Sequence, residues 1–476
     1  MTGRLVGIHL ARFASSSPRI GGLFRGVSTA GSNSIFSKQL KSSPSEVPSS
    51  RYMNLPLISL TKSYSSAQTT NAVFAPPSSL GVQTEGASKG HCDAVSDVRL
   101  DDGGKQLIMS WEGGQSQTFP YVWLRDNCRC SKCFHPVALA RLTMAHDLDV
   151  DVTVASADKS PEGDDVIIHW DDGHESQFPS DWLAAYRFVD SQRDQILNPK
   201  YKLWGADIDL QSFEFGELLE DDRALHDWLA ELVIRGIAVV KNTPSEVGQL
   251  HRLGGRVAFL RSCNYGPTFQ VKSKVDPSNA AYTSGPLALH TDLAYYIRQP
   301  GIQMLHCIEQ AECTGGENLF SDGFKVALDL KEVDPEAFRL LTTVQFEFFD
   351  VGTDHYGKFH QYSRHPTIEL DELKEIASIT ISDHSRDPML RVPPDQVQPV
   401  YRALSKYCKM LVEPQNLLKY KMEKGDITTF NNRRALHGRS AFQVTKASGR
   451  HLEGSYLEWD EVNSRLRVLA AELQSK

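Results

Sequence analysis

Three side chains in two short segments have the chemistry of a metal centre. His290 and Asp292 stand two positions apart, where a strand-like run ends. Because alternate residues of a strand project from one face, the imidazole and the carboxylate can converge on one ion. His437, further along the chain, is the candidate third ligand. Two histidines and one carboxylate leave three metal positions open, as in the non-haem iron oxygenases. The pattern therefore predicts a catalytic iron(II) site.

Two further residues favour 2-oxoglutarate as the co-substrate of this iron. Arg450 follows His437 along the chain, and Thr314 precedes a glycine pair downstream of Asp292. A guanidinium can hold a carboxylate by two parallel hydrogen bonds. The distal carboxylate of 2-oxoglutarate needs such a clamp, while its 2-oxo acid end chelates iron. A lone His-x-Asp pair often arises by chance, but these elements in this order favour an oxygenase.

A cysteine cluster predicts a second metal site. Cys128, Cys130 and Cys133 place three thiols within one short turn, and Cys-x-x-Cys is a common zinc half-site. His174, in a hairpin after Trp170, is the best fourth ligand, because His135 is too close in sequence to fold back. With four protein ligands the zinc would be structural and would add folding energy. The alternative is a set of free, reduced cysteines.

The elements that position these groups form two segments. Residues 93–190 show short alternating stretches, and Leu107–Trp111 and Val166–Trp170 are predicted strands. Asp172-Gly173 is a hairpin-turn signal. A small β-rich, zinc-binding N-terminal domain is therefore expected, with a connection at Asn198-Pro199. No internal repeat is expected.

Residues 205–476 are predicted to be mixed α+β, and mainly β. Helical spacing covers Ala224–Ile234 and Val397–Leu411, and Asp460 is the expected N-cap of a last helix. The strand-like runs are Ile237–Val240, Gly301–Ile308, Val344–Phe349, Ile427–Phe430 and His451–Trp459. Many strands with a few flanking helices predict a jelly-roll catalytic core.

Charge is distributed unevenly along the 476 residues. Residues 1–90 are rich in Ser, Gly and Arg, and Glu46 and Glu85 are their only acids. This composition predicts a mitochondrial transit peptide; a plain disordered tail on a cytoplasmic protein is the alternative. The whole chain has a net charge of −8, so the remainder is acidic, which argues against nucleic acid as a partner. No apolar run is long enough to predict a membrane span.

These motifs carry a resemblance to a known family. The iron and 2-oxoglutarate residues look like those of the taurine-dioxygenase-type superfamily, whose core is a double-stranded β-helix. From about residue 93 to 470 the chain is similar to the gamma-butyrobetaine dioxygenase family. The matching segments are Val122–Cys128, Ala281–Thr283, Leu305–Ile308, Asp322–Phe324, Leu436–Arg439 and Arg450–Gly454. The resemblance implies a homodimer that uses iron(II), zinc, 2-oxoglutarate and L-ascorbate.

The resemblance also implies a small cationic trimethylammonium substrate. Such a group cannot donate a hydrogen bond, so charge and aromatic faces must hold it. The family's aromatic cage maps to Tyr265, Phe269, Tyr282 and Tyr456. Asn279 matches a residue that binds the substrate carboxylate. The implied reaction hydroxylates gamma-butyrobetaine to L-carnitine, coupled to decarboxylation of 2-oxoglutarate to succinate and carbon dioxide. Taken singly, each ring is equally an ordinary core residue.

Three departures from the family pattern leave other functions open. Phe269 stands where the family usually has Trp, and Leu293 stands where a Tyr often follows the metal Asp. The family's second carboxylate-binding Asn is replaced near Asp383-His384. Trimethyllysine is therefore the alternative substrate, since its extra amino group would suit an acid such as Asp383. Two further alternatives are a non-catalytic zinc protein that binds a quaternary ammonium and a zinc protein that binds nucleic acid.

Overall fold

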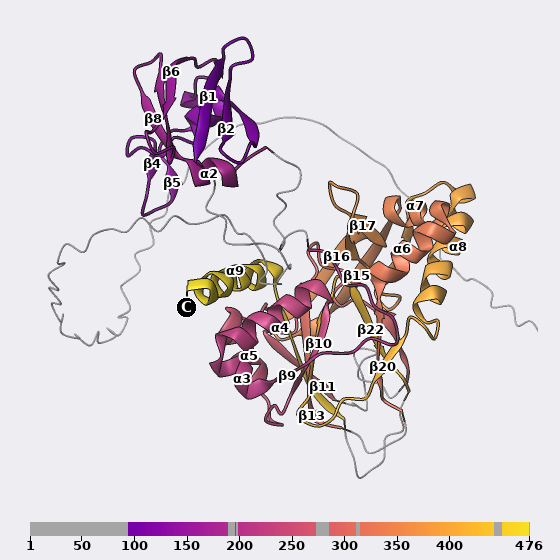
Figure 1. Cartoon of the computed structure of the whole chain (residues 1–476). Helices are drawn as coiled ribbons and strands as arrows, with labels where there is room; N and C mark the ends of the chain where they lie inside the picture. Colours follow the sequence, from indigo (N-terminus) through magenta and orange to yellow (C-terminus); the bar gives the residue numbers. More distant parts are fainter. Residues whose placement is uncertain are drawn as a thin grey trace, which may run out of the picture. The chain divides into compact units, whose positions relative to one another are not determined.

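The computed structural model describes residues 94–188, 196, 199–272, 285–310, 315–441 and 450–475 (Figure 1). The predicted transit peptide lies outside these residues. No helix among the described residues is both long and apolar enough to cross a membrane.

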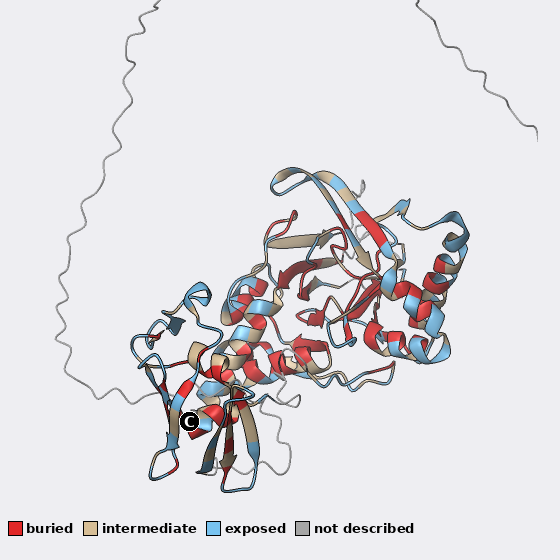
Figure 2. Cartoon of the chain, turned by 90° about the horizontal axis from the view of Figure 1, so that it is seen from above, coloured by how far each residue is buried: buried red, intermediate tan, exposed pale blue. Residues whose placement is uncertain are grey.

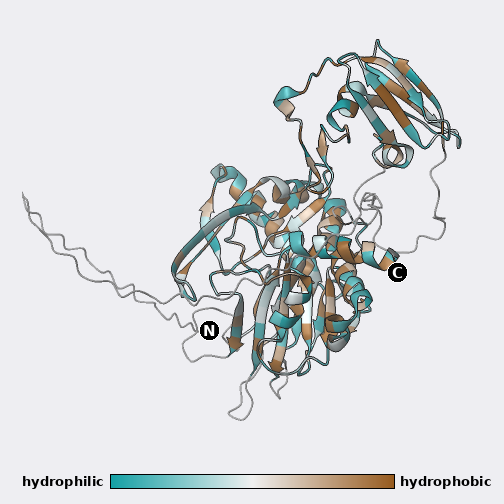
Figure 3. Cartoon of the chain, turned by 90° about the vertical axis from the view of Figure 1, so that its left-hand side faces the viewer, coloured by the Kyte–Doolittle hydropathy of each residue, from teal (hydrophilic) through white to brown (hydrophobic). Residues whose placement is uncertain are grey.

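Two three-stranded antiparallel sheets make up most of residues 94–188. Each sheet is followed by a short helix. The elements are β1 (Val95–Asp101), β2 (Gln106–Trp111), β3 (Ser116–Pro120), α1 (Tyr121–Asp126), β6 (Val154–Lys159), β7 (Asp165–Trp170), β8 (Glu175–Pro179) and α2 (Ser180–Ala185). Alternate apolar residues of both sheets, such as Leu107, Met109, Val166 and Ile168, are fully buried in one core. Figure 3 shows hydrophobic and hydrophilic positions alternating along the strands. The predicted strands and the Asp172-Gly173 hairpin are confirmed.

The two halves of this part repeat one unit, so the expectation of no internal repeat is wrong. Both halves run strand–strand–strand–helix, and identical residues recur at a constant offset. Among the pairs are Trp111 and Trp170, Phe119 and Phe178, Pro120 and Pro179, Trp123 and Trp182, and Leu124 and Leu183. Both hairpins close alike, because Trp111 N–H donates to the Gln115 carbonyl and Trp170 N–H to the His174 carbonyl, each at 2.9 Å. Most of the identical residues are buried, partly buried or in turns, and the exposed residues between them differ, which obscures the repeat.

A segment rich in metal-binding residues separates the two units. It contains the two-residue strands β4 (Phe134–His135) and β5 (Ala140–Arg141) and the 3-10 turn η1 (Ala145–Asp147). The amide of Leu142 donates to the Cys133 carbonyl at 2.8 Å, which ties this hairpin to the cysteine cluster.

Two sheets form the centre of residues 199–475. The larger has the order β11-β23-β13-β21-β10-β9 and the smaller β12-β22-β14-β20. Their bounds are β9 (Ser212–Glu214), β10 (Ile237–Lys241), β11 (Thr268–Lys272), β12 (Leu287–His290), β13 (Ile302–Glu309), β14 (Asn318–Asp322), β20 (Leu418–Tyr420), β21 (Ile427–Asn431), β22 (Ala435–Arg439) and β23 (His451–Leu457).

The chain passes repeatedly from one sheet to the other. β11, β13, β21 and β23 belong to the larger sheet, whereas β12, β14, β20 and β22 belong to the smaller. The sheets pack face to face, since Phe320 of β14 and Phe430 of β21 lie 5.2 Å apart between ring centroids within one buried cluster. This alternation is the double-stranded β-helix, a jelly roll, so the predicted fold class is confirmed.

Helices cover the outer face of the larger sheet. They are α3 (Phe215–Glu220), α4 (Asp222–Ile234), α5 (Gln249–Val257) and α9 (Trp459–Ser475). Their apolar sides pack with Ile302 and Met304 of β13 in a second cluster, and Figure 2 shows helices buried on one side and exposed on the other. Since α9 begins at Trp459, Asp460 lies in its first turn and is not the expected N-cap. Val462, Leu466 and Leu469 are fully buried, as the spacing predicts.

A long insertion joins β14 to β20. It comprises α6 (Gly323–Val333), α7 (Pro335–Thr343), β15 (Gln345–Asp354), β16 (Gly357–Pro366), β17 (Ile368–Leu370), β18 (Ile376–Ile379), β19 (Arg386–Leu390) and α8 (Pro394–Leu411). Its three helices pack on one another and bury residues such as Phe324 and Leu404 beside Leu436 of β22. β15 and β16 form a ten-residue antiparallel hairpin, which brings Asp350 near the aromatic residues described below.

Candidate active site

His290 and His437 face each other across the smaller sheet. His290 is the last residue of β12, and it is the register partner of His437 in β22. Their ring centroids are 4.2 Å apart. Because residues directly opposite on antiparallel strands project from the same face, pairing alone brings both imidazoles together. The prediction that a strand ends at His290 is therefore confirmed. His437 is far away in the sequence, and strand pairing brings it next to His290.

Asp292 completes the cluster from just beyond β12. Its Oδ1 lies 3.2 Å from His290 Nε2 and 3.6 Å from His437 Nε2. Adjacent ligands of a metal bound at about 2.1 Å are about 3 Å apart, so this spacing suits one ion with little movement. His290 Nδ1 donates to the Ala288 carbonyl at 2.8 Å, which leaves the Nε2 lone pair free for a metal. The structure thus brings together all three predicted ligands.

Two contacts hold the Asp292 residue in this orientation. Asn432 is fully buried; its Oδ1 accepts from Asp292 N–H at 2.8 Å and its Nδ2 donates to the Asp292 carbonyl at 3.0 Å. This side chain replaces the missing strand partner at a point where Leu293 adopts a positive φ of 55°. Tyr456 Oη donates to Asp292 Oδ2 at 2.7 Å, which leaves Oδ1 for the metal. Sequence reasoning missed Asn432, because no local pattern links it to Asp292.

The three side chains adjust one another's protonation. Burial would raise the pKa of Asp292, but the neighbouring imidazoles of His437 and His290 hold that pKa well below its usual range. Burial lowers the pKa of His437 to about 3, and the neighbouring His290 lowers it further. One ionised carboxylate and one neutral imidazole are the forms that bind a metal.

A cationic end of the barrel lies two residues along the sheet from the histidines. Asn318 pairs with Arg439 across β14 and β22, and Phe320 pairs with His437. Arg450 is 6% exposed and donates from Nη2 to Asn318 Oδ1 at 3.2 Å. Two residues of a strand span about 7 Å, so the cationic end and the metal ligands are separated by about this distance. A dicarboxylic acid can span it if one end chelates the metal and its second carboxylate lies four bonds away. Arg439, also buried, adds a cation that the sequence reading did not assign.

An aromatic cluster reaches Asp292 through Tyr456. Phe269 of β11 has its ring centroid 6.0 Å from that of Tyr265 and 5.5 Å from that of Tyr456 of β23. Tyr265 Oη also lies 3.1 Å from Tyr295 Oη. The structure therefore brings three of the four predicted cage residues together and adds Tyr295. The other predicted site residues, Tyr282, Asn279 and Thr314, lie outside the described residues.

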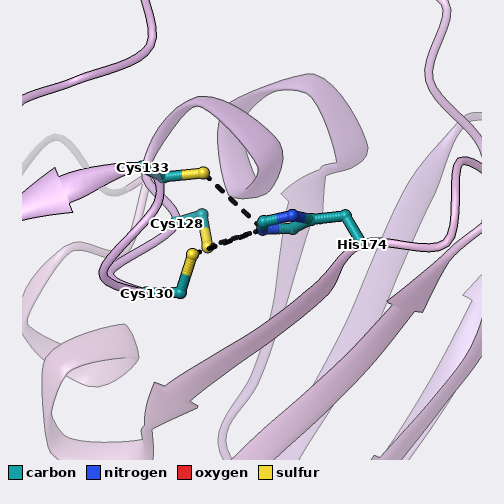
Figure 4. Close-up of side chains that lie close together, drawn as sticks. All are labelled: Cys128, Cys130, Cys133 and His174. Atoms are coloured by element: carbon teal, nitrogen blue, oxygen red, sulfur yellow. Dashed lines mark hydrogen bonds between the residues drawn. The ribbon is translucent and has the colours of Figure 1, made fainter.

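The cysteine cluster is closed by His174, as expected (Figure 4). His174 Nε2 lies 3.3 Å from the sulfur of Cys128 and 3.6 Å from those of Cys130 and Cys133. A tetrahedral zinc with ordinary bond lengths separates sulfur from nitrogen by about 3.6 Å. His135 is not part of the cluster; its Nδ1 accepts from Ala138 N–H at 3.0 Å.

Groups around the cysteines also fit a structural metal. Burial raises the pKa of Cys128 to about 11, so a nearby dication is needed to ionise this thiol. Arg125 donates to the Cys133 sulfur at 3.5 Å and to Asp172 at 3.4 Å. Asp172 in turn accepts from His174 N–H at 2.8 Å. These contacts orient the two ligand segments toward each other.

The repeat gives this site a metal-free counterpart. Gln115 occupies in the first unit the position of His174 in the second, and Arg187 follows α2 as Cys128 follows α1. Arg187 Nη1 donates to Gln115 Oε1. A hydrogen bond therefore closes one hairpin-to-helix junction, while the Cys3His cluster closes the other.

Fold and site together define an iron(II)- and 2-oxoglutarate-dependent dioxygenase. Residues 195–456 match the taurine catabolism dioxygenase TauD, TfdA family, and residues 98–184 match the gamma-butyrobetaine hydroxylase-like N-terminal family. The chain is 36% identical to the gamma-butyrobetaine dioxygenase of Homo sapiens over 380 residues, which is 79% of this chain and 97% of that protein.

Other relatives agree on the class. Identity is 33% to the gamma-butyrobetaine dioxygenase of a Pseudomonas species, over 76% of this chain and 93% of that protein. It is 32% to the mitochondrial trimethyllysine dioxygenase of Rattus norvegicus, over 74% of this chain and 82% of that protein. The chain belongs to the gamma-butyrobetaine dioxygenase family.

Proposed function

We propose that this enzyme hydroxylates gamma-butyrobetaine to L-carnitine, coupled to the oxidative decarboxylation of 2-oxoglutarate to succinate and carbon dioxide. The observation that carries the proposal is the hydrogen bond from Tyr456 to Asp292, which joins the aromatic cluster directly to the metal carboxylate. A trimethylammonium group held on these rings would have its own carbon chain beside the metal. The 36% identity to a gamma-butyrobetaine dioxygenase supports the same substrate.

The iron ligands are His290 Nε2, Asp292 Oδ1 and His437 Nε2. When bound there, iron and 2-oxoglutarate supply the dioxygen chemistry that oxidises a C–H bond. Arg450, assisted by Arg439, holds the distal carboxylate of 2-oxoglutarate, and Thr314 contributes to the same site. L-Ascorbate would serve as the reductant for iron held at this site.

The substrate is held at its two ends. Tyr265, Phe269, Tyr282 and Tyr456 surround the quaternary ammonium, and Asn279 binds the carboxylate. The aromatic rings exclude water and offer negative faces to the cation, while the two anchors fix which carbon lies next to the metal. Placement of one C–H bond is therefore the main contribution of these residues to the reaction.

The chain is proposed to have two domains, to form a homodimer and to be located in mitochondria. Residues 93–190 form a zinc-binding domain whose ion is held by Cys128, Cys130, Cys133 and His174, and residues 205–476 form the catalytic domain. The protein acts as a homodimer, and residues 1–90 direct it to mitochondria; a cytoplasmic location is the alternative. An acidic chain with no cationic stripe supports a small-molecule substrate and not nucleic acid.

Trimethyllysine is the second candidate substrate. Its α-ammonium needs an acid near the metal, and Asp383 and His384 are close by, since the His384 ring lies 6.1 Å from that of His290. Asp383 is already paired with Arg386 at 3.0 Å, so its charge is largely compensated. This ion pair supports gamma-butyrobetaine as the substrate, because it leaves less negative charge for a second ammonium.

Product analysis decides between the two substrates. The purified protein is incubated with iron(II), ascorbate, 2-oxoglutarate and each amine, and hydroxylated products and succinate are quantified. We expect carnitine, with succinate in equal amount, and little hydroxytrimethyllysine. Hydroxylation of trimethyllysine alone would reject the proposal. His437→Ala is the control, and unchanged 2-oxoglutarate turnover in this variant would reject the oxygenase mechanism itself.

A further inference from the structure

A carboxylate of the insertion reaches the aromatic cluster. Asp350 lies on β15, and Tyr265 Oη donates to its Oδ2 at 3.3 Å. Tyr295 Oη lies 3.1 Å from Tyr265 Oη, and a hydrogen bond to Asp350 contributes to raising the pKa of Tyr295 far above its usual value, after burial and Tyr265. Three oxygen-bearing side chains from separate segments therefore meet at the edge of the cluster.

Asp350 forms no ion pair with any residue in the described part of the chain, whereas Glu347, three positions earlier on β15, pairs with Arg391. A half-buried carboxylate without a cation carries a desolvation cost. That cost is offset when a cationic ligand binds within the same cluster.

Resting on the function proposed above, we infer that Asp350 is a specificity-determining residue that selects the cationic head of the substrate through Tyr265. A phenol that donates to a carboxylate has a more electron-rich ring, so its face attracts a quaternary ammonium more strongly. The carboxylate itself lies beyond the hydroxyl and adds a longer-range Coulomb attraction. Asp350 thereby discriminates a trimethylammonium group from a neutral group of the same shape.

Asp350→Asn and Asp354→Asn form a matched pair. Both remove one charge from β15, but Asp354 is exposed beside the hairpin turn, where it accepts from His355 N–H. We expect Asp350→Asn to raise the KM for the trimethylammonium substrate about tenfold, and Asp354→Asn to leave it unchanged. The KM for 2-oxoglutarate and the affinity for iron(II) should not change in either variant.

A neutral analogue separates charge from shape. The compound in which carbon replaces the quaternary nitrogen of gamma-butyrobetaine is used as a competitive inhibitor. Its Ki should be the same for the wild type and Asp350→Asn, because it offers no charge to the carboxylate. A parallel loss of both substrate and analogue affinity would mean that Asp350 only supports packing, and would overturn the inference. So would kinetics of Asp350→Asn that match those of Asp354→Asn.

A binding assay keeps this inference separate from the proposed reaction. Tetramethylammonium is titrated into the iron- and 2-oxoglutarate-loaded protein without oxygen, and heat is measured. If the wild type hydroxylates neither gamma-butyrobetaine nor trimethyllysine, the proposed function fails. In that case a weaker titration with Asp350→Asn than with Asp354→Asn still supports the inference, and equal titrations overturn it.

Discussion

Tyr456 Oη donates a hydrogen bond of 2.7 Å to Asp292 Oδ2, and this bond links the aromatic cluster to the metal cluster. Tyr456 is almost fully buried, and burial raises the pKa of its hydroxyl well above the usual value, with Asp292 adding to the shift. The hydroxyl thus remains a donor at all working pH values. One residue therefore belongs to the aromatic cluster and also supports the carboxylate of the metal cluster.

Replacing Tyr456 by Phe keeps the ring and removes only this hydrogen bond. The carboxylate then loses its fixed orientation, so we expect iron(II) affinity to fall about tenfold or more, as for other groups that orient metal ligands. The KM for the cationic substrate should rise less than the iron affinity falls, because the ring remains and the bound metal already withdraws charge from Asp292. Anaerobic iron titration and steady-state kinetics measure the two effects. Unchanged iron affinity would show that Oδ2 needs no partner.

Asn432→Ala should weaken iron binding without touching any ligand. The change leaves the N–H and C=O of Asp292 unpaired in a buried site, which costs about 1–3 kcal/mol for each unsatisfied group. Asn416→Ala is the matched control, since Asn416 is equally buried but bonds to Met410 O and Lys325. We expect both variants to melt earlier and only Asn432→Ala to lose iron affinity. Equal iron affinities would reduce Asn432 to a general stabilising role.

Zinc removal should loosen one unit of the repeat and spare the other. After chelation, hydrogen exchange should accelerate in 127–142 and around His174, because the Cys3His cluster closes that junction. The first hairpin, around Gln115, should stay protected, because its junction with Arg187 contains no metal ligand. Cys133→Ser should reproduce the chelated pattern. Uniform acceleration across 94–188 would mean that the zinc stabilises both units.

Stability should fall in mild acid because of His306. This side chain is fully buried in β13 with no hydrogen-bond partner for either nitrogen among the described residues, and burial lowers its pKa to about 4. In the unfolded chain the pKa of this histidine is near 6.5. Between pH 6.5 and pH 4 the unfolded chain therefore binds a proton at His306 that the folded chain does not bind. The contribution of neutral His306 to the free energy of unfolding is fully present above pH 6.5. It is lost as pH falls toward 4, and the total loss is on the order of 3 kcal/mol.

Denaturant unfolding of the metal-loaded protein at a series of pH values tests this. His306→Leu should flatten the dependence between pH 6.5 and pH 4 relative to the wild type. His169→Leu is the control, since His169 is exposed on β7 and should leave the slope as it is. An unchanged slope in His306→Leu would assign the acid sensitivity to other groups.

Much of the architecture follows from local patterns. Apolar alternation and turn residues located β2 and β7, because burial of one face imposes a period of two. Continuous strand-like runs located β10, β13 and β21, because these strands are buried on both faces. The repeat in 94–188 was not predicted, because the shared core residues are separated by exposed residues that differ between the two halves. The start of α9 differed from expectation because acids favour the first turn of a helix as well as its N-cap.

Residue types and short spacings by themselves determined the chemistry of this protein. His290 and Asp292, and the three cysteines, are close in sequence, and metals restrict which side chains can bind them. Only the tertiary structure decided which distant groups support that chemistry. Asn432 and Asp350 are ordinary polar residues in their own segments, and strand pairing and an insertion carry them to Asp292 and Tyr265. Such contacts join segments far apart in the chain, and no local periodicity encodes them.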